Sequence, residues 1–448
     1  MPLVHLFAVF ALLAGEGPSG LHPILDPAFQ QELNGATNSV LAVSDEIQLL
    51  VDGKESYPVR WRMLENAEHS IHLTTMYIFA DETTEKLRDI LVRKKNEGVD
   101  VKLIVYGPYS LGNPGFYRHL RECGVDVKKY SGWREVLLRN PLRFWKRHLH
   151  DKYLVVDGQE ALLGGMNWSG RYERGGSVPK DAWRDTDVYV RGPQAGIIEQ
   201  EFMKRWYLDE APERSEAIAK ELADAYRAPI YPPSRSYAEF IHPHAPGTPI
   251  SRLAPPRADP AYTADGLTRF LYQQPFEQDR AVYVTNFYKE IIDRAQSHIW
   301  WQSISTRPAP IQKKALIEAA ARGVDVRLMT NSRRNMNMIP IGGFAVYFLT
   351  RVEYRELLKA GIRIFEYRGD APMHSKGFVV DGVVAAVGSY NATFTAERYY
   401  TESALAIYDR EAIQDVYLMF DDDFAACSEV TLETLEAEQS RASTITCR

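Results

Sequence analysis

The chain has 448 residues, of which 45% are apolar and 25% are charged, and its formal net charge is −6. This composition is typical of a soluble globular protein, and the length predicts two or three domains rather than a single core. The acidic total argues against a general nucleic-acid-binding surface. The three cysteines, Cys123, Cys427 and Cys447, are too few and too scattered for a disulfide framework or a metal site, although a Cys427–Cys447 bridge stays open for an exported chain.

Residues 1–20 stand apart from the rest. Leu3 to Ala14 is an almost unbroken apolar run, and a segment rich in Gly, Pro and Ser follows it. The run is shorter than the roughly 20 residues that cross a bilayer, and it suits the core of a signal peptide or a short membrane anchor. No Lys or Arg precedes it, so a buried N-terminus is the alternative. No later segment is long and apolar enough to span a bilayer.

A first lobe is expected over residues 40–212. Thr84–Leu91 has apolar residues three and four positions apart, which predicts a helix. Gly98 then leads into Val99-Asp100-Val101, as a glycine that ends a helix leads into a strand. Helices and strands alternate in this way along the lobe, which is typical of a layered α/β sheet.

The first lobe contains the motif H-x-K-x4-D, with His150, Lys152 and Asp157. Its apolar centre, Tyr153–Val156, predicts a short strand that ends in an Asp-Gly turn. A turn of small residues, Gly164–Asn167, follows at a fixed distance, since Asn167 lies 167 − 150 = 17 residues after the histidine.

Residues 213–262 are expected to connect the lobes as a linker. Nine prolines fall between positions 228 and 260, and proline cannot sustain a helix or a central strand. We interpret the stretch as an extended connection across the surface. His242 and His244 lie within it, but no cluster of Cys or carboxylates completes a metal site.

A second lobe over residues 263–430 repeats the first, and residues 431–448 form a C-terminal tail. The motif recurs with His374, Lys376 and Asp381, and Asn391 lies 391 − 374 = 17 residues after its histidine. A single short motif is a weak signal, whereas two copies with matched downstream turns are much stronger. The predicted fold is therefore α/β, with two homologous lobes, each a mixed β-sheet flanked by helices, related by a pseudo-two-fold axis.

The paired motifs predict phosphoryl transfer. A neutral histidine can attack a phosphodiester and form a phosphohistidine, and a second histidine can protonate the leaving oxygen. We assign the first role to His150 and the second to His374, although the symmetry of the motifs does not fix that order. The lysine and asparagine of each copy would offset charge on the phosphate oxygens; these residues are Lys152, Lys376, Asn167 and Asn391.

Further residues are assigned supporting roles. Asp185 and Glu402 occupy equivalent positions just before a strand and would orient the histidine rings. Ser169 and Thr393, each two residues after its asparagine, would contact phosphate through their hydroxyls. Asp157 and Asp381 have the opposite strand parity from the histidines, so we expect structural turn or ion-pair roles for them.

The duplicated motif with its G-[GS]-x-N turn resembles the phospholipase D superfamily, from about Asp45 to Phe424. Within it, Met76–Phe79, Gly98–Val101 and Trp183–Asp185 look most like bacterial cardiolipin synthases and their phosphatidyltransferase relatives. The resemblance implies phosphatidyl transfer to the hydroxyl of a second lipid, through a phosphohistidine, with no metal or other cofactor. Bacterial synthases often carry two N-terminal transmembrane helices, and this chain differs in having only the short apolar start.

Two segments bear on the substrate. Residues 133–148 interleave basic and bulky apolar side chains, which suits an anionic membrane interface. Residues 336–349 are strongly apolar and would shelter acyl chains, enter a bilayer or pack in the core. The expected partners are phospholipids and a membrane surface, with no nucleic acid and no obligate protein partner. We expect a membrane-associated bacterial protein, exported to the periplasm or peripheral on the inner membrane.

Alternatives remain open at this stage. A phospholipase D hydrolase would use the same residues with water as the acceptor. Basic residues interleaved with aromatics also suit single-stranded nucleic acid, so a phosphodiesterase or nuclease is the main rival. A peripheral membrane scaffold would require both motifs to be vestigial.

Overall fold

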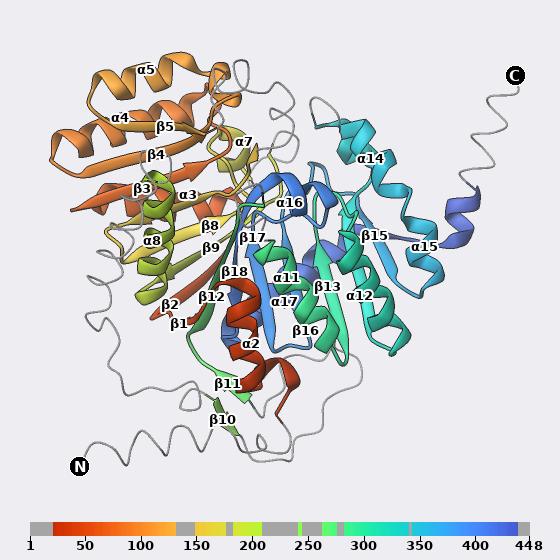
Figure 1. The fold of residues 1–448 in the computed structure, drawn as a ribbon. Coiled ribbons are helices and arrows are strands. Elements are labelled where there is room, and N and C mark those ends of the chain that lie inside the picture. Colours follow the sequence, from red (N-terminus) through yellow and green to blue (C-terminus); the bar gives the residue numbers. More distant parts are fainter. Residues whose placement is uncertain are drawn as a thin grey trace, which may run out of the picture.

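A computed structural model describes residues 21–130, 148–175, 182–207, 241–243, 262–275, 282–339 and 343–437. It consists of two mixed β-sheets, each flanked by helices, and so confirms the α/β fold with two lobes (Figure 1). The predicted N-terminal segment 1–20, most of the linker 213–262 and the basic, aromatic segment 131–147 lie outside the described residues.

The sheet of the first lobe has the strand order β2-β9-β8-β7-β3-β4-β5. Its β3, β4 and β5 are parallel to one another, and the other neighbours are antiparallel. The strands are β2 (Glu46–Val51), β3 (Ser70–Thr75), β4 (Asp100–Tyr106), β5 (Asp126–Tyr130), β7 (Tyr153–Val156), β8 (Glu160–Gly164) and β9 (Thr186–Arg191). The helices are α3 (Gly53–Asn66), α4 (Glu82–Asn96), η2 (Tyr109–Gly112), α5 (Pro114–Glu122), α7 (Gly170–Glu173) and α8 (Pro193–Tyr207).

The second sheet repeats this order as β12-β18-β17-β16-β13-β14-β15 and adds β1 at one edge and β19 at the other. Its strands are β1 (Leu41–Val43), β12 (Leu267–Gln273), β13 (His298–Gln302), β14 (Asp325–Asn331), β15 (Arg363–Tyr367), β16 (Gly377–Val380), β17 (Val384–Gly388), β18 (Tyr400–Ile407) and β19 (Cys427–Val430). The helices are α11 (Tyr283–Arg294), α12 (Pro310–Ala321), α13 (Arg333–Asn337), α14 (Gly343–Arg351), α15 (Tyr354–Lys359), α16 (Phe394–Tyr399) and α17 (Arg410–Ala425).

Glycines end the corresponding helices of both lobes. Helices α4 and α5 in the first lobe, and α12 and α15 in the second, are each followed by a glycine with positive φ, namely Gly98, Gly124, Gly323 and Gly361. A residue with a Cβ is strained in this left-handed conformation, so glycine stops the helix and turns the chain into the next strand. The helix-end glycines predicted from sequence are therefore confirmed.

The segment before the first lobe belongs to the second one. Elements η1 (Pro23–Leu25) and α2 (Pro27–Thr37) bury Ile24, Phe29 and Leu33 in the core of the second lobe. Strand β1 pairs with β12, so the first few residues of the predicted first lobe contribute to the second sheet. At the other end, residues 432–437 are helical and bury Leu435 in the same core, although the sequence suggested only a tail.

The lobes share a core. One cluster of buried side chains includes Leu163 and Val188 from the first lobe together with Phe270, Trp300 and Leu405 from the second. Strand β6 (His148–Leu149) also crosses over and pairs with β18. The two sheets are thus held face to face. Among the described residues, no helix has both the length and the hydropathy needed to cross a membrane.

Candidate active site

Both motifs lie at the same edge of their sheets. Strand β7 runs antiparallel to β3, and Tyr153 at its start pairs with Thr74 near the end of β3. Strand β16 has the same relation to β13. The histidine and lysine that precede each strand therefore lie at the C-terminal edge of the parallel strands, where loops commonly position functional groups.

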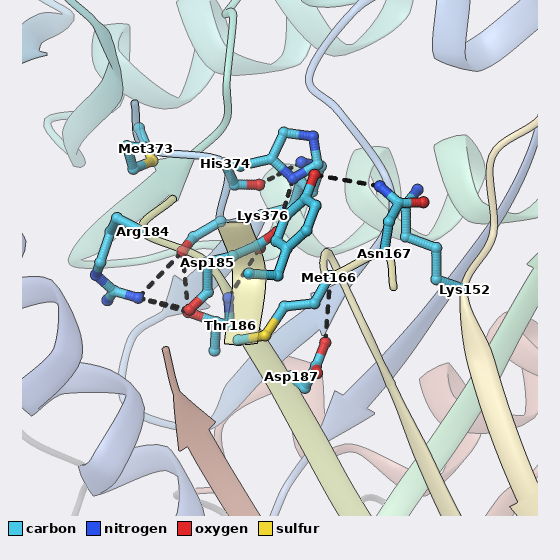
Figure 2. Close-up of polar contacts among 12 residues, drawn as sticks. Lys152, Met166, Asn167, Arg184, Asp185, Thr186, Asp187, Met373, His374 and Lys376 are labelled. Carbon is cyan, nitrogen blue, oxygen red and sulfur yellow. Dashed lines mark hydrogen bonds and ion pairs between the residues drawn. The ribbon is translucent and has the colours of Figure 1, made fainter. Parts of the chain in front are cut away.

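Each histidine binds a carboxylate of the other lobe. Nδ1 of His374 lies 2.7 Å from Oδ2 of Asp185, and Nδ1 of His150 lies 2.9 Å from Oε2 of Glu402. Both rings and both carboxylates are buried. Because Nδ1 faces the carboxylate in each pair, the Nδ1–H tautomer is favoured and Nε2 keeps its lone pair. Figure 2 shows His374 and Lys376 beside Asn167 and Lys152 of the first lobe.

The environment keeps both rings neutral. Burial lowers the pKa of His374 to about 4, and the ammonium of Lys376 adds to this, while Asp185 opposes it. Burial lowers the pKa of His150 well below its ordinary value, and the ammonium groups of Lys152 and Lys376 lower it further. The basic groups of both lobes therefore act on one another across the interface.

The carboxylates of the two pairs differ. Burial raises the pKa of Asp185, but His374 and Lys376 more than offset this, so its pKa lies below the ordinary value. Burial raises the pKa of Glu402 well above its ordinary value. Asp185 is thus the better partner for a positively charged imidazole.

Each motif lysine is buried and folds back on its own motif. Lys152 Nζ donates to the carbonyl oxygen of His150, and Lys376 Nζ donates to that of His374. Burial lowers the pKa of Lys152 to about 8 and that of Lys376 to about 7. An anionic ligand would favour the ammonium forms, because it supplies the negative charge that these groups lack.

The side chain of each asparagine is held by a residue that lies just after a parallel strand of its lobe, β3 for Asn167 and β13 for Asn391. The Asn167 side-chain oxygen accepts from the backbone N–H of Tyr77 at 3.1 Å, and its amide donates to the Tyr172 hydroxyl at 3.2 Å. In the second lobe, the Asn391 side-chain oxygen accepts from the Ser303 hydroxyl at 3.3 Å. The ring of Tyr172 lies 5.8 Å from that of His374, so the turn of one lobe reaches the histidine of the other.

The motif aspartates lie at the far ends of β7 and β16. Asp157 and Asp381 both adopt φ of 54°. The Asp157 carboxylate accepts backbone N–H groups at the start of β3, and the Asp381 carboxylate accepts those at the start of β13. Burial opposes ionisation of Asp381, but hydrogen bonds from His22 and from the backbone of His298 hold its pKa well below the ordinary value.

The predicted phosphate-binding hydroxyls occupy the starts of helices. Thr393 is the N-cap of α16, and its hydroxyl accepts from the backbone N–H of Ala396 at 3.2 Å. Ser169 is the N-cap of α7 and is fully buried. The structure therefore gives Thr393 a capping contact and gives Ser169 no exposure at the site surface.

Sequence reasoning missed the aromatic residues beside the histidines. The Trp183 ring lies 5.2 Å from the His374 ring, and the Tyr400 ring lies 5.3 Å from the His150 ring. Each aromatic residue stands two positions before the carboxylate that binds the same histidine. That repeated spacing, aromatic-x-carboxylate, is the signal that could have identified them.

Two buried ion pairs near the motifs were also missed. Arg184 makes a bidentate contact with Asp423 on α17 of the other lobe, with N–O distances of 2.9 and 2.8 Å. Arg205 on α8 binds Asp151, the second residue of the first motif, at 2.6 Å. Because the partners lie far apart in the sequence, no local pattern reveals these pairs.

Within the described ranges, no group of three or more His, Cys, Asp or Glu side chains is arranged to hold a metal ion. Cys123 and Cys427 are free thiols, and Cys447 lies outside the described residues. The arrangement combines two neutral imidazoles, two ammonium groups and two carboxylates. Such a set can attack a phosphodiester and offset its charge, and an imidazole that has gained a proton can donate it to the leaving oxygen.

A duplicated α/β lobe with paired H-x-K motifs at the interface defines an enzyme of the phospholipase D class. The chain matches the family described as "Cardiolipin synthase, PLD-like domain" over residues 61–206 and 288–424, and it belongs to that family.

Relatives of known name agree with this family. The chain is 26% identical over 405 residues to a cardiolipin synthase of Geobacillus sp. (strain WCH70), covering 89% of this chain and 70% of that protein. It is 28% identical over 392 residues to cardiolipin synthase A of Pseudomonas entomophila (strain L48), covering 87% and 71%. Its fold is similar to that of phosphatidylserine synthase from Haemophilus influenzae Rd KW20, with a TM-score of 0.62 at 14% identity, covering 90% and 91%.

Proposed function

We propose that the protein transfers a phosphatidyl group between glycerophospholipids, as a cardiolipin synthase does, through a phosphohistidine intermediate. The observation that supports this most strongly is the crossed pairing of His150 with Glu402 and of His374 with Asp185. It presents two neutral Nε2 atoms, one from each lobe, beside two buried lysines. The named relatives support the same substrate class.

In the first step, Nε2 of His150 attacks the phosphorus of the donor lipid. An N–P bond forms, the bond from phosphorus to the headgroup oxygen breaks, and His374 supplies the proton that this oxygen takes up. With phosphatidylglycerol as donor, glycerol leaves and the phosphatidyl group stays on His150. In the second step, a hydroxyl of a second phosphatidylglycerol attacks phosphorus, His374 accepts its proton, and the N–P bond breaks to release cardiolipin.

The environments of the two rings favour this order. Burial and the ammonium groups of both motif lysines keep both rings neutral in the free site, so either Nε2 is available to attack, and the carboxylates distinguish the two roles. The acid must hold a proton when the phosphate is bound, and the ionised Asp185 stabilises a charged His374. A bound phosphate would raise the pKa of His374 from about 4 toward neutrality, because it adds negative charge beside the ring.

Charge on the phosphate would be offset by the buried groups around it. The proposed donors are the two motif lysines and the asparagines of the turns that follow, Lys152, Lys376, Asn167 and Asn391, all of them buried. In a buried site such donors are effective because they are already oriented when charge develops on the equatorial oxygens. The reaction belongs at a membrane surface, since both proposed substrates are bilayer lipids.

The test is to incubate the purified protein with phosphatidylglycerol, phosphatidylethanolamine and single-stranded DNA, and to resolve the products by mass. Cardiolipin and glycerol from phosphatidylglycerol are expected. Phosphatidic acid without cardiolipin would indicate hydrolysis, and cleaved DNA with unchanged lipids would overturn the proposal in favour of a nuclease.

The histidine assignment has its own test. His150→Ala and His374→Ala should each remove essentially all turnover, whereas the control His69→Ala, which removes an exposed histidine, should keep it. His374→Ala should be given a donor lipid whose headgroup oxygen leaves without protonation. A phosphatidyl adduct should then be trapped on His150, because the first step no longer needs the acid. An adduct found only on His374 of His150→Ala would reverse the two roles.

A further inference from the structure

The exposed apolar side chains of the protein gather at one edge. Among the described residues, eleven large apolar side chains are exposed, and nine of them lie in the connections or first helical turns that follow the C-terminal ends of β4, β13 and β14. These nine are Tyr109, Leu111, Ile311, Met338, Phe344, Val346, Phe348, Leu349 and Val352. The motif histidines lie at the same edge of the two sheets, so apolar residues of both lobes are exposed on the side of the molecule that holds the candidate active site.

Helix α14 is the centre of this surface, and its exposure is inverted relative to an ordinary surface helix. It exposes Phe344, Ala345, Val346, Phe348 and Leu349, and it buries Gly343, Tyr347 and Thr350. A soluble surface helix turns its apolar face inward. The rings of Phe344 and Phe348 lie 4.5 Å apart, so they form one continuous apolar patch.

The position of α14 follows from a difference between the lobes. After β4, the first lobe reaches Gly124 in 124 − 106 = 18 residues, whereas after β14 the second lobe takes 361 − 331 = 30 residues to reach Gly361. The longer connection contains α13 and α14, and Figure 1 shows α14 at the upper right of the second lobe. Asn331 at the end of β14 binds the backbone of Met373, next to His374, which connects this insertion to the site.

Charge indicates what covers the patch. Residues 333–352 include Arg333, Arg334 and Arg351 and no acidic residue, although the whole chain carries a net charge of −6. The Arg333 guanidinium lies 5.7 Å from the Phe344 ring. Arg334 is exposed and contacts Asp370 at 3.4 Å, whereas Arg351 is largely buried and contacts Glu366 at 3.6 Å. Apolar side chains flanked by arginines match the interface of an anionic bilayer, where the rings enter the acyl region and the arginines meet phosphates.

We infer that α14 and the apolar residues around it dock the protein on an anionic lipid bilayer with the active-site edge toward the lipid. The inference rests on the proposed function and deepens it, because it gives the bilayer lipids a direct route to the site. A second protein copy on the same patch would cover that edge, whereas a bilayer there delivers the substrates. The apolar segment 336–349 identified in the sequence thus acts in part as a membrane contact rather than as core.

The test compares two apolar positions of equal exposure. Leu349 on α14 is 52% exposed and Leu418 on α17 is 50% exposed. The full-length chain is prepared with His374→Ala, so that lipid composition stays constant, and is sedimented with vesicles of equimolar phosphatidylglycerol and phosphatidylcholine. Adding Phe344→Ser, Phe348→Ser and Leu349→Ser should weaken vesicle binding about 100-fold, since each side chain loses its apolar contact. Leu349→Ser alone should weaken binding about fivefold, its share of that loss, whereas Leu418→Ser should bind as the parent does.

Arginine variants test the charge. Arg333→Gln with Arg334→Gln should weaken binding to the mixed vesicles about tenfold and leave binding to pure phosphatidylcholine unchanged. Equal vesicle binding by the α14 triple variant and Leu418→Ser would overturn the inference. So would a parent that is dimeric in sedimentation velocity and becomes monomeric in the triple variant without any change in vesicle binding.

Activity measurements distinguish a failure of membrane docking from a failure of the proposed reaction. In the active background, the α14 triple variant should lose activity on vesicles but keep it on dispersed short-chain phosphatidylglycerol below its micelle concentration. Loss of both activities would place the damage in the site and overturn the docking role. A parent that binds vesicles through α14 yet produces no cardiolipin would defeat the proposed reaction while leaving the docking surface in place.

Discussion

Asp185 of the first lobe accepts a hydrogen bond from His374 of the second lobe, with 2.7 Å between Oδ2 and Nδ1. The pair formed by His150 and Glu402 crosses the interface in the opposite direction. Neither lobe alone therefore contains a complete histidine–carboxylate pair. In the proposed mechanism the interface between the lobes is itself the catalytic assembly, and any change that shifts one lobe relative to the other disturbs both pairs.

The first prediction concerns this crossed contact. Asp185→Asn should lower kcat by about 10³- to 10⁴-fold, because an amide favours the wrong tautomer of His374 and does not stabilise its charged form. The fold should persist, since the amide has the same shape. Cardiolipin formation is measured by initial rates, with circular dichroism to check folding. Asp89→Asn, which alters an exposed carboxylate on α4, is the control. Normal kcat in Asp185→Asn would contradict the role of the carboxylate.

The sequence predicted the parts of the site but not their pairing. The motif strands, the helix-ending glycines and the equivalence of Asp185 and Glu402 follow from a repeat in one dimension, because local propensity and spacing determine them. Which carboxylate binds which histidine depends on how the two sheets face each other, and no pattern within one lobe encodes that. The buried contact of Arg184 with Asp423 was missed for the same reason, because its partners are joined only by the tertiary fold.

The second prediction concerns the pH dependence of activity. In the proposed mechanism Lys376 and Lys152, with pKa values of about 7 and about 8, hold phosphate only as ammonium groups. Their protons are present below these values and are lost as the pH rises, so kcat/KM should fall on the alkaline side as the pH passes first 7 and then 8. Lys376→Arg keeps its charge over this range and should leave only the fall near the pKa of Lys152. A flat profile across both pKa values would exclude the lysines from phosphate binding.

The third prediction is that the buried ammonium group of Lys376 lowers the free energy of unfolding. The pKa of Lys376 falls from 10.5 unfolded to about 7 folded, so the unfolded chain binds more protons between these values and stability rises with pH there. The cost is greatest below pH 7, on the order of 5 kcal/mol at about 1.4 kcal/mol per pKa unit. Lys376→Met should therefore raise the free energy of unfolding at pH 6, and the gain should shrink toward pH 10.

Denaturant unfolding at several pH values measures this gain. The exposed Lys314 on α12 supplies the matched control, and Lys314→Met should change the free energy of unfolding by less than about 0.5 kcal/mol at any pH. Lys376→Met should also be inactive, so the same substitution would raise the stability of the fold and abolish the activity. A loss of stability at pH 6 would contradict the cost assigned to the buried charge.

The fourth prediction concerns the ion pair that joins the lobes. Arg184 and Asp423 are both buried and contact each other in bidentate geometry. Arg184→Met should lower the free energy of unfolding by about 3–5 kcal/mol, because it leaves Asp423 as an uncompensated buried charge. The double variant with Asp423→Asn should lose less than the sum of the two single losses.

An exposed pair gives the comparison for this cycle. Arg363 and Glu429 are also bidentate but lie on the surface, and they should couple by about 0–1 kcal/mol. Equal coupling energies for the two pairs would show that burial at the lobe interface adds nothing.

The fifth prediction uses one of the two positions at which the turns Gly164–Asn167 and Gly388–Asn391 differ. A Cβ on Gly165 would lie 2.0 Å from Oδ1 of Asp185, so Gly165→Ala must displace that carboxylate from His374. Its counterpart in the second lobe is Ser389, whose hydroxyl donates to Glu402. We expect Gly165→Ala to lower kcat by about 10²-fold or more, since small errors in the position of a catalytic group are costly.

Ser389→Ala removes one hydrogen bond without adding bulk, so kcat should fall only about tenfold. Rates on phosphatidylglycerol compare the two variants, and a Gly165→Ala protein as active as Ser389→Ala would mean that the carboxylate of Asp185 need not be held against the ring.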